Sequence, residues 1–221
     1  MYYIINGLVL NTKVQGEYDK LITLYSYEFG KVQAIVPGAK KITAKLSSAT
    51  EPLTESEFLV FSTHLAMRVK VTGASIIKNN TRIKIDLNKN LYALYAAEIS
   101  DKFTPFNLEN FRKYNLIVRI WEILETCKYP KRALIAFILR FLKLSGYAFS
   151  DYLKRVNTFV SKDIENTIKK LSSCSGNDID YMDEVEDEKI WDCVESYLTN
   201  YISRPSLSVF LKKIEKYKLR N

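Results

Sequence analysis

The 221-residue chain carries 33 lysine and arginine side chains against 25 aspartate and glutamate side chains, a formal net charge of +8, and is 47% hydrophobic. This composition supports a substantial core in one large or two small domains. Three widely spaced cysteines, Cys127, Cys174 and Cys193, form no C-x-x-C pair, which argues against both a disulfide framework and a zinc site. The longest apolar run is too short to span a bilayer and no signal-peptide pattern opens the chain, so we expect a cytoplasmic protein without a membrane segment.

The positive charge is unevenly distributed along the chain. Residues 1–80 carry a net +3 and residues 81–160 a net +7, whereas residues 161–221 carry a net −2. A basic front and middle favour a polyanionic partner, nucleic acid before membrane, although a charge that serves only solubility remains open.

Short runs rich in β-branched and aromatic residues fill the first 80 residues. Turn residues separate them, and several alternate between apolar and polar positions, as in Val32, Ala34 and Val36. We predict five strands, at Tyr3 to Val14, Leu21 to Phe29, Lys31 to Val36, Glu57 to Ser62 and Ala66 to Ile77. Five short strands favour a small closed barrel of the OB type, with an SH3-like barrel as the competing arrangement.

From Leu87 onward the apolar period becomes helical, so the fold class is α+β, an N-terminal barrel (1–80) followed by a helical domain (81–221). Asn107 is the expected N-cap of the second helix, whose Ile117, Trp121 and Leu124 share one face. The third helix, Pro130 to Leu144, is apolar almost all round and is expected at the centre of the domain. Weaker helical segments are predicted near Ser161 to Leu171, Glu188 to Tyr201 and Ser206 to Tyr217, with an acidic stretch from Asp178 to Glu188 between the first two.

A basic loop follows the third predicted strand and is the first candidate for contacts with nucleic acid. A mobile cationic loop can neutralise phosphates without reading sequence, and an exposed aromatic ring beside it can stack on bases. The candidate nucleic-acid contacts are Lys31, Lys40, Lys41, Lys45, Tyr25, Arg68 and Lys70. A solvated loop and solvent-facing strands would show the same pattern.

Several motifs in fixed order resemble the bacterial DNA repair protein family RecO. They include Gly16-Glu17-x-Asp19-x-Leu21-x-Thr23-Leu24, Glu28-x-Gly30-Lys31, Gly38-Ala39-Lys40-Lys41, Pro52-Leu53-Thr54 and a central Pro130-x-x-Ala133-Leu134 helix ending at Gly146-Tyr147. The chain departs from the family pattern after Tyr147, where no four-cysteine zinc module follows, so no metal or other cofactor is expected.

The resemblance implies a recombination mediator that binds single- and double-stranded DNA, anneals complementary strands and helps load a recombinase in gap and double-strand-break repair. Its implied partners are RecR, the acidic tail of single-stranded DNA-binding protein and, indirectly, RecA. An acidic tail ending in phenylalanine requires an apolar pocket with cations at its rim. The residues with that chemistry here are Arg119, Lys131, Arg132 and Arg140.

No catalytic motif is present in the sequence, and no catalytic residue is predicted. There is no P-loop, nucleophile elbow or H-E-x-x-H pattern, and His64 is the single histidine. Two alternatives to the mediator stay open: an RNA-binding OB-fold protein, and a scaffold whose helical domain binds proteins.

Overall fold

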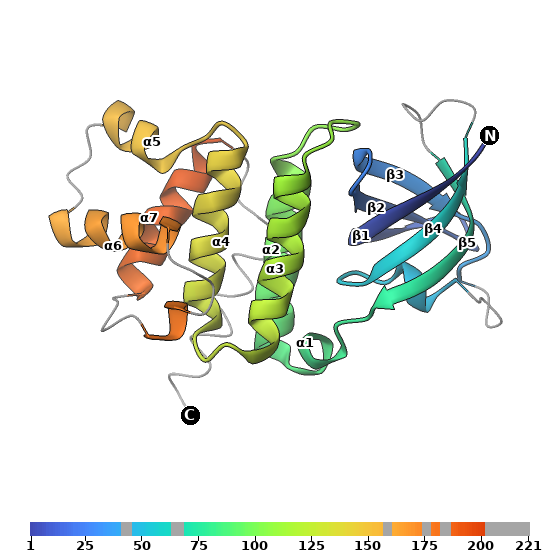
Figure 1. The fold of residues 1–221 in the computed structure, drawn as a ribbon, viewed down its shortest axis with the longest axis horizontal. Helices are drawn as coiled ribbons and strands as arrows, with labels where there is room; N and C mark the ends of the chain where they lie inside the picture. The colour runs from blue at the N-terminus through green and yellow to red at the C-terminus, as the bar shows by residue number, and fades with distance from the viewer. Residues whose placement is uncertain (41–45, 63–68, 157–160, 174–177, 182–186, 202–221) are drawn as a thin grey trace.

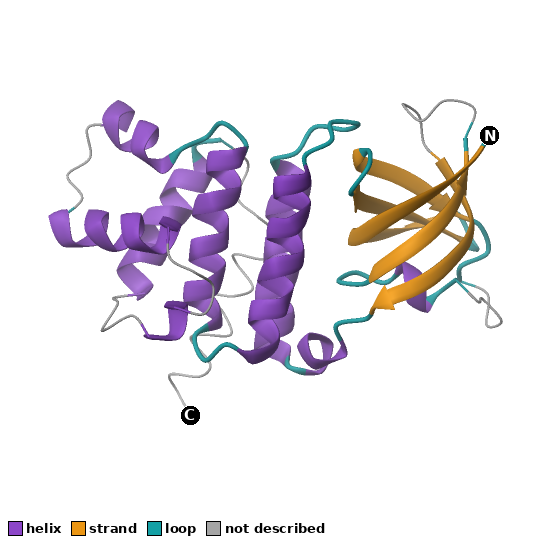
Figure 2. Cartoon of the chain, viewed as in Figure 1, coloured by secondary structure: helices purple, strands orange, loops and turns teal. Residues whose placement is uncertain are grey.

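A computed structural model describes residues 1–40, 46–62, 69–156, 161–173, 178–181 and 187–201. Five strands lie at one end of an elongated molecule and the helices lie at the other (Figures 1 and 2). The α+β fold predicted from the sequence is confirmed. The helix predicted near Ser206 to Tyr217 lies outside the described residues.

The strands close into a barrel in the order β1-β2-β3-β5-β4. Neighbouring strands are antiparallel except β3 and β5, which pair in parallel at Ala34 with Val69 and Ile35 with Lys70. This one parallel pair requires a crossover, which the chain between β3 and β5 supplies through β4 and a 3-10 turn at Ser48–Thr50. The strands are β1 Tyr2–Gln15, β2 Asp19–Ser26, β3 Gly30–Val36, β4 Glu55–Phe61 and β5 Val69–Lys78.

Alternating apolar residues fill the barrel interior, as the period-two pattern predicts. On β3 the side chains of Val32, Ala34 and Val36 are buried, and on β2 those of Ile22 and Leu24 join the same cluster. The residues between them on each strand point to the outside of the barrel, where they are either exposed to solvent or covered by other parts of the chain.

Helices account for the rest of the described chain. Asp86 caps α2 by accepting hydrogen bonds from two backbone amides, and Asn110 caps α3 by accepting one, from the Lys113 amide. The sequence suggested Asn107 for that cap, but Asn107 adopts a left-handed conformation with φ of 55°, and the cap is Asn110, three residues later. The helices are α1 Thr81–Ile85, α2 Leu87–Lys102, α3 Phe111–Thr126, α4 Pro130–Leu144, α5 Phe149–Val156, α6 Lys162–Ser173 and α7 Asp187–Thr199, with a 3-10 turn at Asp178–Tyr181.

The α4 helix is the centre of the helical region, as its apolar sequence predicts. Eleven of its 15 residues are buried, and it contacts α2, α3, α5, α6 and α7. The α2 and α3 helices stand between α4 and the barrel (Figure 1). No helix in the described ranges is both long enough and apolar enough to cross a membrane.

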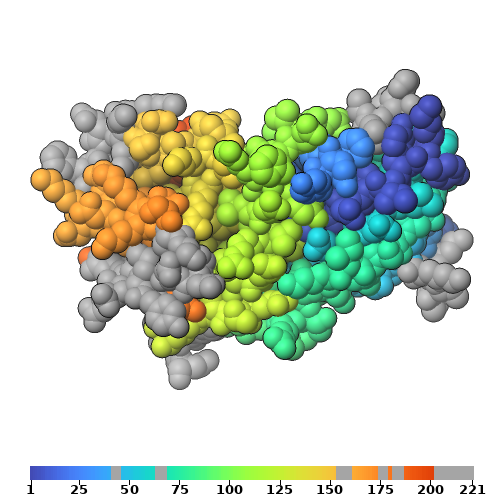
Figure 3. All heavy atoms as spheres, viewed as in Figure 1, coloured from blue at the N-terminus to red at the C-terminus, as the bar shows by residue number. Residues whose placement is uncertain are grey.

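The barrel and the helices touch along one side of the barrel (Figure 3), and they share a continuous apolar cluster. Leu8, Leu10, Tyr25 and Leu53 of the barrel belong to the same buried cluster as the cores of α2, α3 and α4. At Gly30 the two parts touch through backbone, because a Cβ there would lie 2.0 Å from the carbonyl oxygen of Leu108. The outer face of the β2–β3 hairpin is therefore covered by helices at its Gly30 end.

Candidate functional site

One end of the barrel carries an exposed basic surface, built where the β1–β2 turn meets the segment after β3. The Asp19 carboxylate accepts a 2.8 Å hydrogen bond from the Gly38 amide, and the Lys40 amide donates to the Tyr18 carbonyl at 3.0 Å. Gly16 and Gly38 both have φ of 64°, a conformation that glycine adopts without strain. These contacts fix the position of Lys40 beside Tyr18.

Strand pairing brings further lysines to the same end. Lys20 of β2 is opposite Val36, the last residue of β3, and Lys70 of β5 is beside Ile35. Lys40 and Lys70 are exposed and form no ion pair with any described residue. Lys20, Lys40 and Lys70 therefore come from three different elements to one rim, which we call the basic rim. Lys41, Lys45 and Arg68 lie outside the described residues.

Tyr18 is the exposed aromatic residue of the basic rim, and the sequence analysis missed it. Its side chain is 49% exposed, and a hydrogen bond with Glu17 raises the pKa of its phenol, so the ring is neutral at physiological pH. A large aromatic residue within a polar turn has no nearby core to enter, and this position could have identified Tyr18 as an exposed ring from the sequence. A ring beside lysines is the arrangement on which single-stranded nucleic acid stacks.

Lys31 is at the opposite end of β3 and is buried. Its ammonium donates to the Asp101 backbone carbonyl at 2.6 Å and pairs with the Asp101 carboxylate at 3.1 Å, and its side chain is 8% exposed. The ammonium also lies 4.3 Å from the centre of the Phe106 ring. Lys31 points away from the barrel interior, as its strand position indicates, but the end of α2 covers it. The expectation that Lys31 contacts phosphate is therefore corrected.

Tyr25 is likewise covered by the helices instead of standing on an open sheet face. It is fully buried, its hydroxyl donates to the Asn110 carbonyl at 3.4 Å, and its ring centre is 6.5 Å from that of Tyr114. Burial raises the pKa of Tyr25 to about 12. Its expected role as a stacking platform is therefore corrected to a packing role at the barrel–helix junction.

A second candidate surface is an apolar groove between α3 and α4, with a volume of about 810 Å³. Arg119 and Arg140, two of the four predicted partner-binding residues, lie at its rim together with Arg112 and Lys143. The floor is formed by Phe111, Leu116 and Leu144. Arg140 also donates to the Leu171 and Ser172 carbonyls at 3.1 Å, which ties it to the end of α6.

Lys131 and Arg132 are not part of the groove. They lie at the start of α4, where Lys131 pairs with Glu188 at 2.7 Å and Arg132 pairs with Asp187 at 3.1 Å. The Arg132 side chain is only 6% exposed. The described part of the acidic stretch thus packs against these two cations, so the structure divides the four predicted partner residues between two places.

The fold and these surfaces define a class: a closed OB-type barrel with a basic rim, joined to a helical region that presents an apolar groove ringed by cations. Residues 1–80 match the family model "Recombination protein O N terminal", and residues 85–150 match "Recombination protein O C terminal". The chain belongs to the RecO family.

Individual relatives agree with this assignment. The chain is 32% identical over 143 residues to the DNA repair protein RecO of Clostridium perfringens, which covers 64% of this chain and 57% of that protein. It is 33% identical over 111 residues to the DNA repair protein RecO of Bacillus mycoides, covering 50% and 44%, and 30% identical over 142 residues to that of Exiguobacterium sibiricum, covering 64% and 56%. The chain therefore spans about half the length of the curated relatives it matches.

Proposed function

We propose that this protein binds DNA through the basic rim and acts as a recombination mediator in gap and double-strand-break repair. Family membership supports the role, and the basic rim is the observation that carries the proposed contact with DNA. Lysines on a rim, with Tyr18 beside them, suit contacts with phosphates that do not depend on base sequence. Lys41, Lys45 and Arg68 complete the proposed interface.

The proposed mechanism breaks no covalent bond. Two DNA strands repel each other, and a basic surface that holds them lowers the repulsion and raises the rate at which complementary strands meet. Because phosphates are the main contacts, single- and double-stranded DNA both bind, and stacking on Tyr18 adds affinity for single strands. Annealing follows from these two properties.

The groove between α3 and α4 is the proposed site for the acidic tail of single-stranded DNA-binding protein. Its apolar floor suits a terminal phenylalanine, and Arg112, Arg119 and Lys143 at the rim suit carboxylates. Binding this tail would bring the protein to coated DNA, where RecR would join it and RecA loading would follow. Lys131 and Arg132 pair with Glu188 and Asp187 outside the groove, so the proposed tail site does not include them.

A salt series of fluorescence anisotropy with a labelled single-stranded oligonucleotide tests the DNA site. We expect the logarithm of affinity to fall linearly with the logarithm of salt, and a Lys40, Lys41 and Lys45 to Ala variant to lose about two units of that slope, at ~0.7 per lost contact. The matched control replaces Lys162, Lys169 and Lys170, which are exposed on α6 and carry the same charge. Equal salt slopes for the two variants would place the DNA contact elsewhere on the protein. If structured RNA binds more strongly than single-stranded DNA, the RNA-binding alternative is favoured.

Peptide titration tests the groove. A labelled acidic peptide ending in phenylalanine should bind the wild type and lose about tenfold in affinity with Leu116→Ser or Arg119→Ala, because the first removes apolar floor and the second a cation. Substitution of Arg140 would be harder to interpret, because Arg140 also holds the end of α6. Lys170→Ala on exposed α6 is the control, and equal loss there would mean that only bulk charge attracts the peptide.

A further inference from the structure

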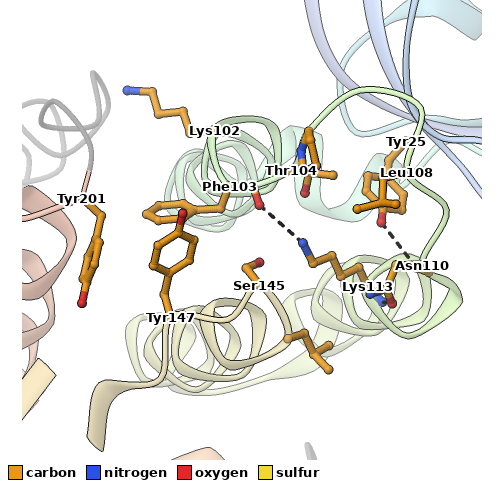
Figure 4. A pocket seen from close by; sticks show the side chains of 12 residues that line it. Tyr25, Lys102, Phe103, Thr104, Leu108, Asn110, Lys113, Ser145, Tyr147 and Tyr201 are labelled. Carbon is orange, nitrogen blue, oxygen red and sulfur yellow. Dashed lines mark hydrogen bonds between the residues drawn. The ribbon is translucent and has the colours of Figure 1, made fainter. Parts of the chain in front are cut away.

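A cavity of about 540 Å³ lies where α2 ends, α3 begins and α4 ends, next to the barrel (Figure 4). It is separate from the basic rim, which is at the other end of β2 and β3, and from the groove between α3 and α4, with which it shares Leu144 alone among the lining residues. Its volume falls in the range of small-molecule sites in proteins, about 300–1,000 Å³.

The Lys113 side chain extends from the first turn of α3 into this cavity (Figure 4). The residue is only 5% exposed, and within the described residues its ammonium makes one hydrogen bond, to the Phe103 carbonyl at 3.4 Å. No carboxylate in the described part of the chain pairs with it. Buried cations in proteins are normally paired, so this ammonium has donor capacity that an anion would satisfy.

The surroundings of Lys113 increase its need for an anion. The nearby Asp101 carboxylate is engaged by Lys31, and burial together with the positive charge of Lys31 lowers the pKa of Lys113. A bound anion would offset both effects, because it supplies an opposite charge within the cavity. Lys102 also lines the cavity, but it pairs with Glu98 at 3.2 Å and points away from Lys113 (Figure 4).

A second buried polar group lines the same cavity. Thr104 is 4% exposed, and its hydroxyl makes no hydrogen bond with any described residue. A buried hydroxyl left unsatisfied loses its hydration without gaining a partner, so proteins rarely retain one without a use. Figure 4 shows Thr104 and Lys113 on one side of the cavity and Tyr147 and Tyr201 on the other.

Aromatic rings form the other side of the cavity. The Phe103 and Tyr147 ring centres are 5.5 Å apart, and those of Tyr147 and Tyr201 are 4.9 Å apart. Tyr147 is 40% exposed, so one face of the row is accessible from the cavity mouth. The planes of these two ring pairs are inclined at 72° and 60°, so a nucleobase would stack on one ring, the exposed Tyr147, which Phe103 and Tyr201 flank.

We propose that this cavity binds a nucleotide unit that carries a terminal phosphate, with the phosphate on Lys113 and Thr104 and the base stacked on Tyr147, the exposed ring of the aromatic row formed with Phe103 and Tyr201. A carboxylate alone would satisfy Lys113 but would leave the aromatic row unused. The same chemistry is presented by a free mononucleotide and by the 5′ end of a DNA strand. The site goes beyond the proposed DNA contact, since it recognises a chain end or monomer and lies away from the basic rim.

Titration calorimetry of the full-length protein with deoxyadenosine 5′-monophosphate tests the site. We expect binding by the wild type, a loss of about tenfold or more with Lys113→Met, and no measurable binding of deoxyadenosine, because a charge-assisted contact is removed in both cases. Lys102→Met removes a charge from the same cavity wall and should stay within about twofold of the wild type. Absence of binding to the wild type, or equal loss in the two lysine variants, would overturn the proposal.

A second variant and a second probe keep the result interpretable. If Lys113→Met does not fold, as judged by thermal unfolding, Thr104→Val carries the same prediction with a smaller loss, about threefold to tenfold. Inorganic phosphate that binds as tightly as the nucleotide would overturn the role of the aromatic row.

Oligonucleotides with and without a 5′-phosphate distinguish the two sources of the ligand. Tighter binding of the phosphorylated strand, lost with Lys113→Met, assigns the cavity to strand ends, whereas equal binding alongside a positive nucleotide titration assigns it to the free monomer. Nucleotide binding without any oligonucleotide binding would refute the proposed DNA contact and leave the cavity site standing. Oligonucleotide binding without nucleotide binding would refute the cavity site and leave the proposed DNA contact standing.

Discussion

The two ends of the β2–β3 hairpin carry the same kinds of residue in opposite surroundings. At one end Tyr18 lies beside the basic rim of Lys20, Lys40 and Lys70, with Lys40 exposed and Tyr18 half exposed. At the other end Tyr25 and Lys31 are buried under α2 and α3. The difference shows that a lysine or tyrosine acquires its role here from the helices that cover it, and that strand position alone does not decide between a ligand contact and a structural one.

Gly30→Ala gives the largest expected effect on the buried end. The new Cβ would lie 2.0 Å from the Leu108 carbonyl oxygen, and alanine is strained at φ of 67°. We expect the free energy of unfolding to fall by about 3 kcal/mol, measured by urea denaturation. Gly16→Ala is the matched control, because φ is 64° there but nothing lies within 4 Å, and it should cost only about 1 kcal/mol. Equal losses would show that the helices do not press on this end of the hairpin.

Lys31→Met and Lys40→Met should separate stability from DNA binding. Removing Lys31 breaks a buried ion pair with Asp101 and a hydrogen bond to its carbonyl, so we expect a loss of about 2 kcal/mol and no change in the salt dependence of DNA binding. Lys40→Met should change stability by less than about 0.5 kcal/mol and reduce the salt slope by ~0.7. The comparison fails if Lys31→Met reduces the slope in a fully folded protein.

Alkaline unfolding should report the burial of Tyr25. The pKa of Tyr25 is about 12 in the folded protein against an ordinary value of 10.0, so the folded state retains a proton that the unfolded state loses. This stabilising contribution is complete below pH 10 and disappears as the pH rises toward 12, at up to about 1.4 kcal/mol per pH unit. Tyr25→Phe should make the loss shallower in denaturant titrations at pH 10 to 12, with exposed Tyr2→Phe as the control.

Local patterns in the sequence were sufficient for most of the fold. Alternation predicted the buried faces of β2 and β3, and an apolar surface all round predicted that α4 would be central, because both patterns depend on neighbours close in the chain. Proline at the first turn placed the start of α4 at Pro130. The resemblance to RecO was confirmed by the family models.

The candidate sites were harder to predict because they depend on contacts between distant residues. Lys31 points away from the barrel interior as its strand position indicates, yet Asp101, 70 residues later, covers it. The acidic stretch has no local reason to bind α4, but Asp187 and Glu188 reach Arg132 and Lys131. The Lys113 cavity was missed for the same reason, since its walls come from three helices.

The backbone contact at Gly30 would also set the geometry if both proposed ligands were bound at once. The β2 strand runs eight residues, roughly 23 Å, from the basic rim to the helices, and the hairpin it forms with β3 is pinned there by Leu108 and Asp101. DNA at the rim and a peptide in the groove would therefore be held at a set separation. If the DNA and the peptide belong to one assembly, binding of the first raises the effective concentration of the second at its site. This holds only if the assembly can span the separation between the basic rim and the groove.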